Sequence, residues 1–144
     1  MPKKQRVDFD IFLRHATQNE HNDPLRMMIQ GIGGTGKSYL IESISHALST
    51  SAATGESPLL LLAPTRIAAF NIHEKTLHST LKIPIKDRKP VTGRSLAVFQ
   101  EEMRHVRYIL IDEMSFIGSR LFMKIYYRLR EAFLDCKSIP FGGR

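Results

Sequence analysis

Residues 31–38 read Gly-Ile-Gly-Gly-Thr-Gly-Lys-Ser, which fits the pattern G-x-x-x-x-G-K-[S/T] in full. The apolar stretch Leu25–Gln30 precedes them and predicts a short buried strand. Apolar residues at helical spacing follow them, at positions 40, 41, 44, 47 and 48. Strand, glycine-rich loop and helix are the context that this pattern requires. The stretch therefore predicts a loop whose backbone N–H groups surround a phosphate at the start of a helix.

The glycines, the lysine and the serine of this loop each suit phosphate binding for a chemical reason. Glycines permit backbone angles that turn successive N–H groups inward. Lys37 is expected to reach the β- and γ-phosphates of a nucleotide, and the Ser38 hydroxyl is expected to bind Mg²⁺. The alternative is a glycine-rich turn that contains a lysine by accident. The nucleotide-binding candidates are Gly31, Gly33, Gly34, Thr35, Gly36, Lys37 and Ser38.

An apolar stretch that ends in two carboxylates, Tyr108-Ile-Leu-Ile-Asp112-Glu113, is the second chemical motif. It is typical of a Walker B element, in which Asp112 would hold the Mg²⁺ shell and Glu113 would orient or deprotonate the attacking water. An acidic pair after a strand is common by itself. Downstream of a complete phosphate loop, it is the expected partner of that loop.

The rest of the chain alternates between strand and helix patterns, which predicts an α/β fold with a largely parallel sheet and helices on both faces. Asp8 and Asp10 are expected in the first turn of the first helix. The predicted helices lie along 9–16, from Pro64-Thr65 through Ile72, around 96–103 and along 121–133. The predicted strands are Leu25–Gln30, Leu59–Ala63 and Val106–Ile111, and the predicted loops are Ser49–Pro58 and Lys82–Arg94.

Composition excludes several classes of protein. With 42% hydrophobic and 24% charged residues, the 144-residue chain has the make-up of one globular domain. No apolar run approaches the roughly 20 residues of a membrane span, and the N-terminus lacks the apolar core of a secretory signal. Cys136 is the only cysteine, which excludes an internal disulfide and a multi-cysteine metal site. The formal charge of +7 is compatible with a polyanionic partner.

Two segments are candidates for contact with such a partner, each with a simpler alternative. Pro64-Thr65-Arg66 follows a predicted strand, where ligand sites of open α/β sheets gather, although Thr65 could equally be a helix cap and Arg66 a solvated side chain. The loop Lys82–Arg94 holds five basic residues against one acid and could follow a nucleic-acid backbone. A solvated loop is the favoured interpretation, because no aromatic residues for base stacking are interleaved with its charges.

Taken together, five motifs in order along nearly the whole chain resemble the petite-integration-frequency (PIF) family of DNA helicases, including the helicase domains of Helitron-type transposons. They are residues 25–38, Ala63–Ile72, Thr76–Ser79, Ile109–Ser115 and Pro140–Gly143. The resemblance implies the N-terminal RecA-like ATPase domain of a superfamily-one helicase over residues 1–144. It also implies a motor that hydrolyses ATP with Mg²⁺ and moves 5′-to-3′ along single-stranded DNA. Roles in DNA repair, recombination and telomere maintenance, and a nuclear or mitochondrial location, are part of what it implies.

The resemblance also assigns residues by position. Gln5 corresponds to the glutamine that reads adenine, and the residues implied to contact DNA are Pro64, Thr65, Arg66, Asn71 and His78. In the family, Pro-Phe-Gly-Gly leads into a strand between the phosphate-loop strand and the Walker B strand, and this sequence ends at Arg144 before it. We therefore expect a sheet that is incomplete at the C-terminus, with unpaired backbone groups on both neighbouring strands.

From this incompleteness we expect the chain alone to show weak or no ATPase activity and no unwinding. Two alternatives to a helicase part remain: a module that binds nucleotide without turnover, and an inactive remnant.

Overall fold

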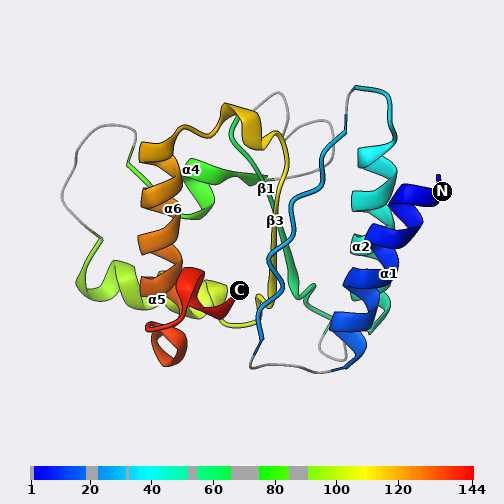
Figure 1. Cartoon of the computed structure of the whole chain (residues 1–144). Coiled ribbons are helices and arrows are strands. Elements are labelled where there is room, and N and C mark those ends of the chain that lie inside the picture. Colours follow the sequence, from blue (N-terminus) through cyan, green and yellow to red (C-terminus); the bar gives the residue numbers. More distant parts are fainter. Residues whose placement is uncertain (1, 19–22, 32, 52–54, 66–74, 85–90) are drawn as a thin grey trace. The chain divides into compact units, whose positions relative to one another are not determined.

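The computed structural model describes residues 2–18, 23–31, 33–51, 55–65, 75–84 and 91–144. The chain forms two compact units, Met1–Pro58 and Leu59–Arg144 (Figure 1). None of the described helices is both long and apolar enough to cross a membrane.

The first unit is a pair of helices, α1 (Lys3–Thr17) and α2 (Lys37–Ser51), packed against each other. Both helices were predicted, and both are longer than predicted. Because α1 begins at Lys3, Asp8 and Asp10 lie in its second turn, and the expectation that they occupy the first turn is wrong. Hydropathy gives no sign of this earlier start, because the first buried residue of α1 is the polar Gln5. The apolar core of this unit consists of Phe12, Leu40, Ile41, Ile44 and Leu48.

The predicted strand Leu25–Gln30 is wrong. These residues are extended coil, and Met28 in their middle is 63% exposed. A strand exists only where a neighbour supplies ladder hydrogen bonds, and no described residue pairs with this stretch. The apolar composition of Leu25–Gln30 is typical of a strand, but composition does not show whether a neighbouring strand is there to pair with it.

Among the described residues, the second unit is built on a three-stranded sheet with the order β2–β1–β3. Its strands are parallel, as the alternating pattern predicted, whereas β2 and the strand order were not predicted. The strands are β1 (Leu59–Ala63), β2 (Lys75–Thr76) and β3 (Tyr108–Ile111). Leu62 is opposite Ile111, and Ala63 is opposite Thr76. Among the described residues β3 pairs with β1 alone, so its other edge lacks a ladder partner there, and all four of its residues are only half-buried.

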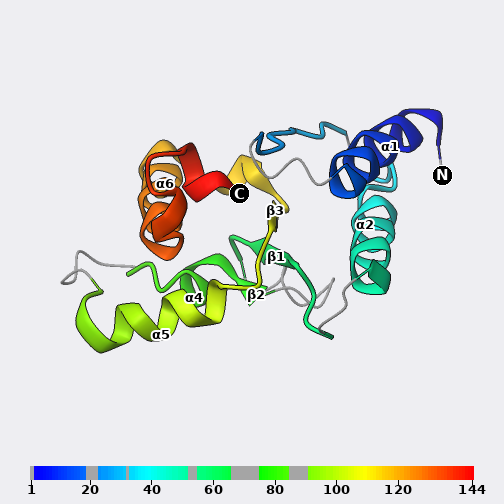
Figure 2. The same ribbon diagram turned by 90° about the horizontal axis from the view of Figure 1, so that it is seen from below.

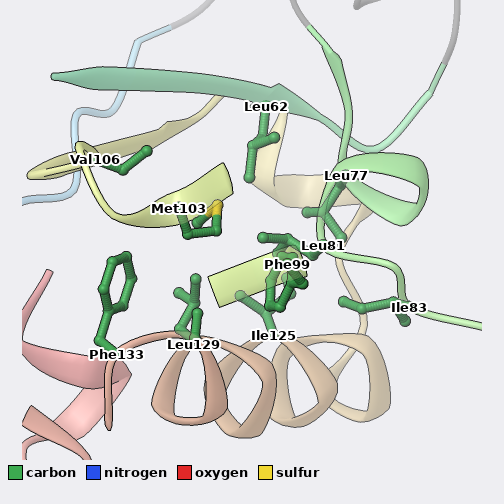
Figure 3. Close-up of a cluster of buried hydrophobic side chains, with 11 residues drawn as sticks. Leu62, Leu77, Leu81, Ile83, Phe99, Met103, Val106, Ile125, Leu129 and Phe133 are labelled. Carbon is green, nitrogen blue, oxygen red and sulfur yellow. The ribbon is translucent and has the colours of Figure 1, made fainter. Parts of the chain in front are cut away.

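In the described part of this unit, three helices accompany the sheet: α4 (Leu77–Thr80), α5 (Gly93–Met103) and α6 (Ser119–Ala132). Figures 1 and 2 both show α5 and α6 on the same side of β1 and β3. Their apolar faces meet Leu62 of β1 in one buried cluster, with Phe99 of α5 and Ile125 of α6 near its centre (Figure 3). The rest of the cluster is Leu77, Leu81, Ile83, Met103, Val106, Leu129, Ala132 and Phe133.

Short 3-10 turns complete this unit: η1 (Met114–Phe116), η2 (Leu134–Cys136) and η3 (Pro140–Gly143). The η3 turn packs on α6, where the Phe141 ring meets Phe122 and Tyr126 edge-on. Arg144 donates to the main-chain oxygen of Val106 at 2.9 Å and lies over the Phe133 ring. The predicted helix through Ile72 falls mostly outside the described residues.

Candidate functional site

The phosphate loop lies where the pattern predicted, directly before α2. Leu40 N donates to the oxygen of Gly36 at 3.2 Å, which begins the helical hydrogen-bond ladder at the end of the loop. The first turn of α2 carries no acidic residue, so nothing there opposes the positive end of the helix dipole. The geometry suits an anion such as a phosphate.

Two glycines of the loop have a side chain close to the position that a Cβ would occupy. A Cβ on Gly31 would lie 2.6 Å from the Thr35 hydroxyl oxygen. Gly36 has a φ of +84°, and a Cβ there would lie 3.0 Å from Nε2 of Gln5. Gly33 and Gly34 have open space around them, and Gly34 has a φ of +76°. Packing therefore limits the residue at Gly31, whereas the positive φ favours glycine at Gly34 and Gly36.

The two side chains assigned to the nucleotide's phosphates and metal lie at the start of α2. Lys37 Nζ donates to the main-chain oxygen of Gly31 at 2.7 Å, so the lysine extends back along the loop. Ser38 is exposed, which leaves its hydroxyl accessible to a ligand. A lysine along the loop and a hydroxyl at the helix start are chemically suited to phosphate oxygens and to Mg²⁺.

Gln5 lies beside the loop, a relationship that only the family resemblance suggested. It is 7% exposed, and its Nε2 donates to the main-chain oxygen of Thr35. Its Oε1 is buried and accepts no hydrogen bond from any described residue. The sequence analysis did not predict the hydrogen bond between Gln5 and the loop. The available signal was the seven-residue spacing from Gln5 to Phe12, which places both residues on the same, buried face of α1.

The acidic pair follows β3 directly, at the carboxyl end of the sheet. Glu113 N donates to Oδ1 of Asp112 at 2.8 Å, and Glu113 has a φ of +53°, in the left-handed region. A non-glycine residue in this region stores about 1–2 kcal/mol of strain, of the kind that collects at functional sites. Sequence patterns contain no signal for this strain.

The carboxyl edge of the sheet gathers the other described candidates of the second unit. Pro64 and Thr65 follow β1, and β1 is hydrogen-bonded to β3 as far as Asp112 N, which donates to Leu62 O at 2.9 Å. His78 lies in α4, just after β2. Since the three strands are parallel, their ends bring Pro64, Thr65, His78, Asp112 and Glu113 to one edge. Of the remaining candidates, Arg66 and Asn71 lie outside the described residues.

Among the described residues of this sheet, one titratable group has a shifted pKa. Burial raises the pKa of Tyr108 above its ordinary value, and the positive charge of Arg107 lowers it by a smaller amount. Tyr108 begins β3, at the opposite end from the acidic pair. Among the described residues no group of three or more His, Cys, Asp and Glu side chains could hold a metal ion.

The whole chain matches a model of one protein family. Residues 1–144 fit the family model of the PIF1-like helicase. The ATP-dependent DNA helicase PIF4 of Trypanosoma brucei brucei is 32% identical over 127 residues, which cover 84% of this chain and 15% of the relative. The ATP-dependent DNA helicase Pif1 of Campylobacter jejuni is 26% identical over 125 residues, which cover 81% of this chain and 27% of that relative. The chain thus spans about a quarter or less of the curated relatives it matches.

Solved structures agree on the fold. An unliganded Pif1 from Bacteroides covers 99% of this chain with a TM-score of 0.71 and 22% identity. Bacteroides Pif1 in complex with ADP-AlF3 and single-stranded DNA covers 94% with a TM-score of 0.67 and 21% identity. This chain covers 29% of each of those chains. The expected fold class, a RecA-like α/β domain with a parallel sheet, is confirmed.

Proposed function

The chain belongs to the PIF1-like helicase family, and from this we propose that it is the ATP-binding motor part of a DNA helicase that moves 5′-to-3′ on single-stranded DNA. The observation that carries the proposal is the phosphate loop at the start of α2, with Lys37 extended along it and Gln5 packed behind it. In this proposal the loop binds the phosphates of ATP and Gln5 contacts the adenine. Telomere maintenance, DNA repair and recombination, in the nucleus or mitochondrion, are the cellular roles we propose.

The residues fit a Mg²⁺-dependent nucleotide site in their chemistry. Mg²⁺ prefers oxygen ligands and is commonly held by one or two protein oxygens together with substrate phosphates and water. Ser38 offers a hydroxyl and Asp112 a carboxylate, and each is an oxygen ligand of the kind that Mg²⁺ accepts. When bound, the ion would neutralise charge on the phosphates. Glu113 would hold the attacking water and accept its proton, while Lys37 would balance the charge of the γ-phosphate.

We propose that single-stranded DNA passes over the carboxyl edge of the sheet. Pro64, Thr65 and His78 lie at this edge, and Arg66 and Asn71 belong to the same motifs in sequence. Contacts of this kind go mainly to phosphate and sugar, so binding should weaken as salt increases and should depend little on DNA sequence.

Thermal unfolding with and without Mg·ATP tests the proposal. A ligand that binds only the folded state adds about 2.7 kcal/mol of apparent stability at a hundredfold excess over its Kd. For a domain of this size that corresponds to a rise in Tm of several degrees. Lys37→Ala should lose most of the rise. An equal Tm with and without Mg·ATP in the wild-type chain would contradict the proposal, and a rise without hydrolysis would favour a nucleotide-binding module.

A further inference from the structure

The outer face of α6 combines basic and aromatic side chains. Ile125 and Leu129 point from α6 into the buried cluster (Figure 3), so the opposite side of the helix faces away from it. Met123 and Tyr127, four residues apart on that opposite side, are 45% and 55% exposed. Basic residues flank this pair at spacings of three and four. We call this set the α6 outer face: Arg120, Met123, Lys124, Tyr127 and Arg130.

The Tyr127 ring is held in place although more than half of it is exposed. Tyr126 meets it edge-on, with ring centroids 5.2 Å apart. Tyr126 is itself edge-on to Phe141 of η3, also at 5.2 Å, and η3 packs on α6. A ring supported in this way loses little conformational freedom when another ring stacks on it. Tyr127 is therefore a preformed stacking surface.

Arg130 is fixed beside the same rings. Its guanidinium lies over the Tyr126 ring, 5.3 Å from the centroid, and its Nε donates to the main-chain oxygen of Lys137 at 2.6 Å. A second N–H group donates to the Tyr126 hydroxyl at 3.4 Å. A guanidinium has five N–H donors, so these contacts leave further donors for an anion. An ordered cation and an ordered ring thus lie side by side.

The positive charge of α6 is not explained by the stability of the helix. Glu131 is the one acidic residue in the sequence of α6, and it pairs with Arg128 at 2.8 Å. Its charge is therefore already balanced. Arg120 lies in the first turn, which has no acidic residue and where a cation meets the positive end of the helix dipole. The charge of the α6 outer face fits a negatively charged partner.

We propose that the α6 outer face binds single-stranded DNA, with one base stacked on Tyr127 and backbone phosphates bound by Arg120 and Arg130. This rests on the proposed function, in which the strand passes over the carboxyl edge of the sheet. The η1 turn and Gly118 connect the carboxyl end of β3 to the start of α6, so the Arg120 end of the face adjoins that edge. The face extends the path of the strand along α6.

The combination of rings and cations favours a nucleic acid as the partner. Proteins that bind single strands without sequence preference join cations for the backbone to aromatic rings for the bases. The α6 outer face has both, whereas the basic segment Lys82–Arg94 has no aromatic residues among its charges. A partner helix would need an apolar groove with several anchors, and the apolar part of this face consists of Met123 and Tyr127.

Fluorescence anisotropy with a labelled oligo-dT strand at low salt tests the stacking contact. Tyr127→Ala should bind about fivefold or more weakly, the usual effect of removing one stacking ring. Tyr127→Phe keeps the ring and should bind as wild type does. The matched control is Tyr39→Ala on α2, because Tyr39 is also 55% exposed, and it should leave the affinity unchanged.

The phosphate contact is tested by the salt dependence of the same binding. Arg120→Gln should reduce the slope of log K against log salt concentration by about 0.7, the value for one phosphate contact on a single strand. Arg107→Gln removes the same charge from an exposed residue directly before β3 and should keep the slope of wild type. Equal slopes in Arg120→Gln and wild type would remove Arg120 from the proposed contact.

The outcomes separate this inference from the proposed function. If Tyr127→Ala binds oligo-dT as tightly as wild type, the inference is overturned, and weaker binding by His78→Ala would still support a strand at the carboxyl edge. If wild type does not bind oligo-dT, both fail. Poly-glutamate carries charge without bases and should displace the strand poorly. If it binds as tightly as oligo-dT and loses affinity equally in Tyr127→Ala, the partner is an acidic protein segment and the inference is wrong.

Discussion

Lys37 Nζ lies 2.7 Å from the main-chain oxygen of Gly31, so the lysine bridges the two ends of the phosphate loop from which it extends. A nucleotide phosphate would offer this ammonium a charged acceptor in place of a neutral carbonyl. The ammonium is charged in both cases, so the exchange adds the attraction of a second, opposite charge, and this favours binding.

Lys37→Met should therefore weaken Mg·ATP binding by about 30-fold or more, corresponding to about 2 kcal/mol for a hydrogen bond to a charged group. Its Tm without ligand should stay near that of wild type, because the hydrogen bond from the lysine to Gly31 O is exposed to solvent. Calorimetric titration and a thermal melt measure the two effects. Lys3→Met, on the exposed start of α1, is the matched control and should bind as wild type does. Equal affinity in Lys37→Met and wild type would show that the loop is not the phosphate site.

Two substitutions of Glu113 separate the backbone strain at this residue from the proposed role of its carboxylate. Glu113→Ala and Glu113→Gly both remove the proposed water-orienting carboxylate, but only glycine relieves the left-handed backbone at φ +53°. We expect both variants to bind Mg·ATP, to lack any hydrolysis that wild type shows, and to differ in stability by about 1 kcal/mol in favour of glycine. Urea denaturation measures the difference. If the alanine variant were as stable as the glycine variant, the strain would not exist in solution.

Several elements were predictable from sequence because their signals are local. The strand β1 matches its predicted bounds, and β3, α5 and α6 differ from theirs by a few residues at their ends. Each combines an apolar run or stripe with a clear stop, such as Pro64 after β1. The phosphate loop is likewise encoded in consecutive residues.

What could not be predicted depends on partners distant in sequence. Leu25–Gln30 has strand composition, yet a strand needs a neighbouring ladder that composition cannot report. The Gln5–Thr35 contact joins residues 30 positions apart. The left-handed backbone conformation of Glu113 could not be predicted, because a glutamate gives no indication of a positive φ. These last two features both involve candidate functional residues, at which local sequence rules most often fail.

Gly142 in the η3 turn should tolerate no side chain. A Cβ there would lie 2.6 Å from the oxygen of Leu129 and 2.9 Å from a ring carbon of Phe133, at a φ of +67°. Gly142→Ala should cost about 2–5 kcal/mol, the sum of overpacking and backbone strain. Gly93→Ala is the matched control, because φ is +59° and nothing lies within 4 Å, so it should cost only about 1–2 kcal/mol. Chemical denaturation of both variants checks the difference, and equal losses would contradict the packing of η3 against α6.

Tyr108 should make the stability of the protein fall at alkaline pH. Burial raises the pKa of its phenol in the folded state, so the unfolded chain loses this proton at a lower pH than the folded protein does. The stabilisation is complete below the unfolded pKa of about 10 and is lost as pH rises through the folded value. Tyr108→Phe removes this contribution. Urea denaturation at pH 8 and above pH 10 should show the variant gaining stability relative to wild type at the higher pH, and parallel losses would contradict the burial.

Two ion pairs of equal spacing should differ sharply in their contribution to stability. Arg128 and Glu131 pair at 2.8 Å with the arginine side chain 9% exposed, whereas Arg104 and Glu101 pair at 3.4 Å with both side chains more than two-thirds exposed. Glu131→Ala leaves a buried guanidinium without its carboxylate and should cost about 2–3 kcal/mol. That is less than for a fully buried pair, because Arg128 keeps Lys82 O at 3.4 Å and the nearby Phe99 ring.

Glu101→Ala leaves Arg104 in water and should change stability by no more than about 0.5 kcal/mol. Urea denaturation at low and high salt separates the two cases, since salt screens exposed pairs far more than buried ones. The effect of Glu131→Ala should therefore persist at high salt. If it fell to the level of Glu101→Ala, Arg128 would be solvated in solution, and the packing of α5 on α6 around Phe99 would be looser than the structure shows.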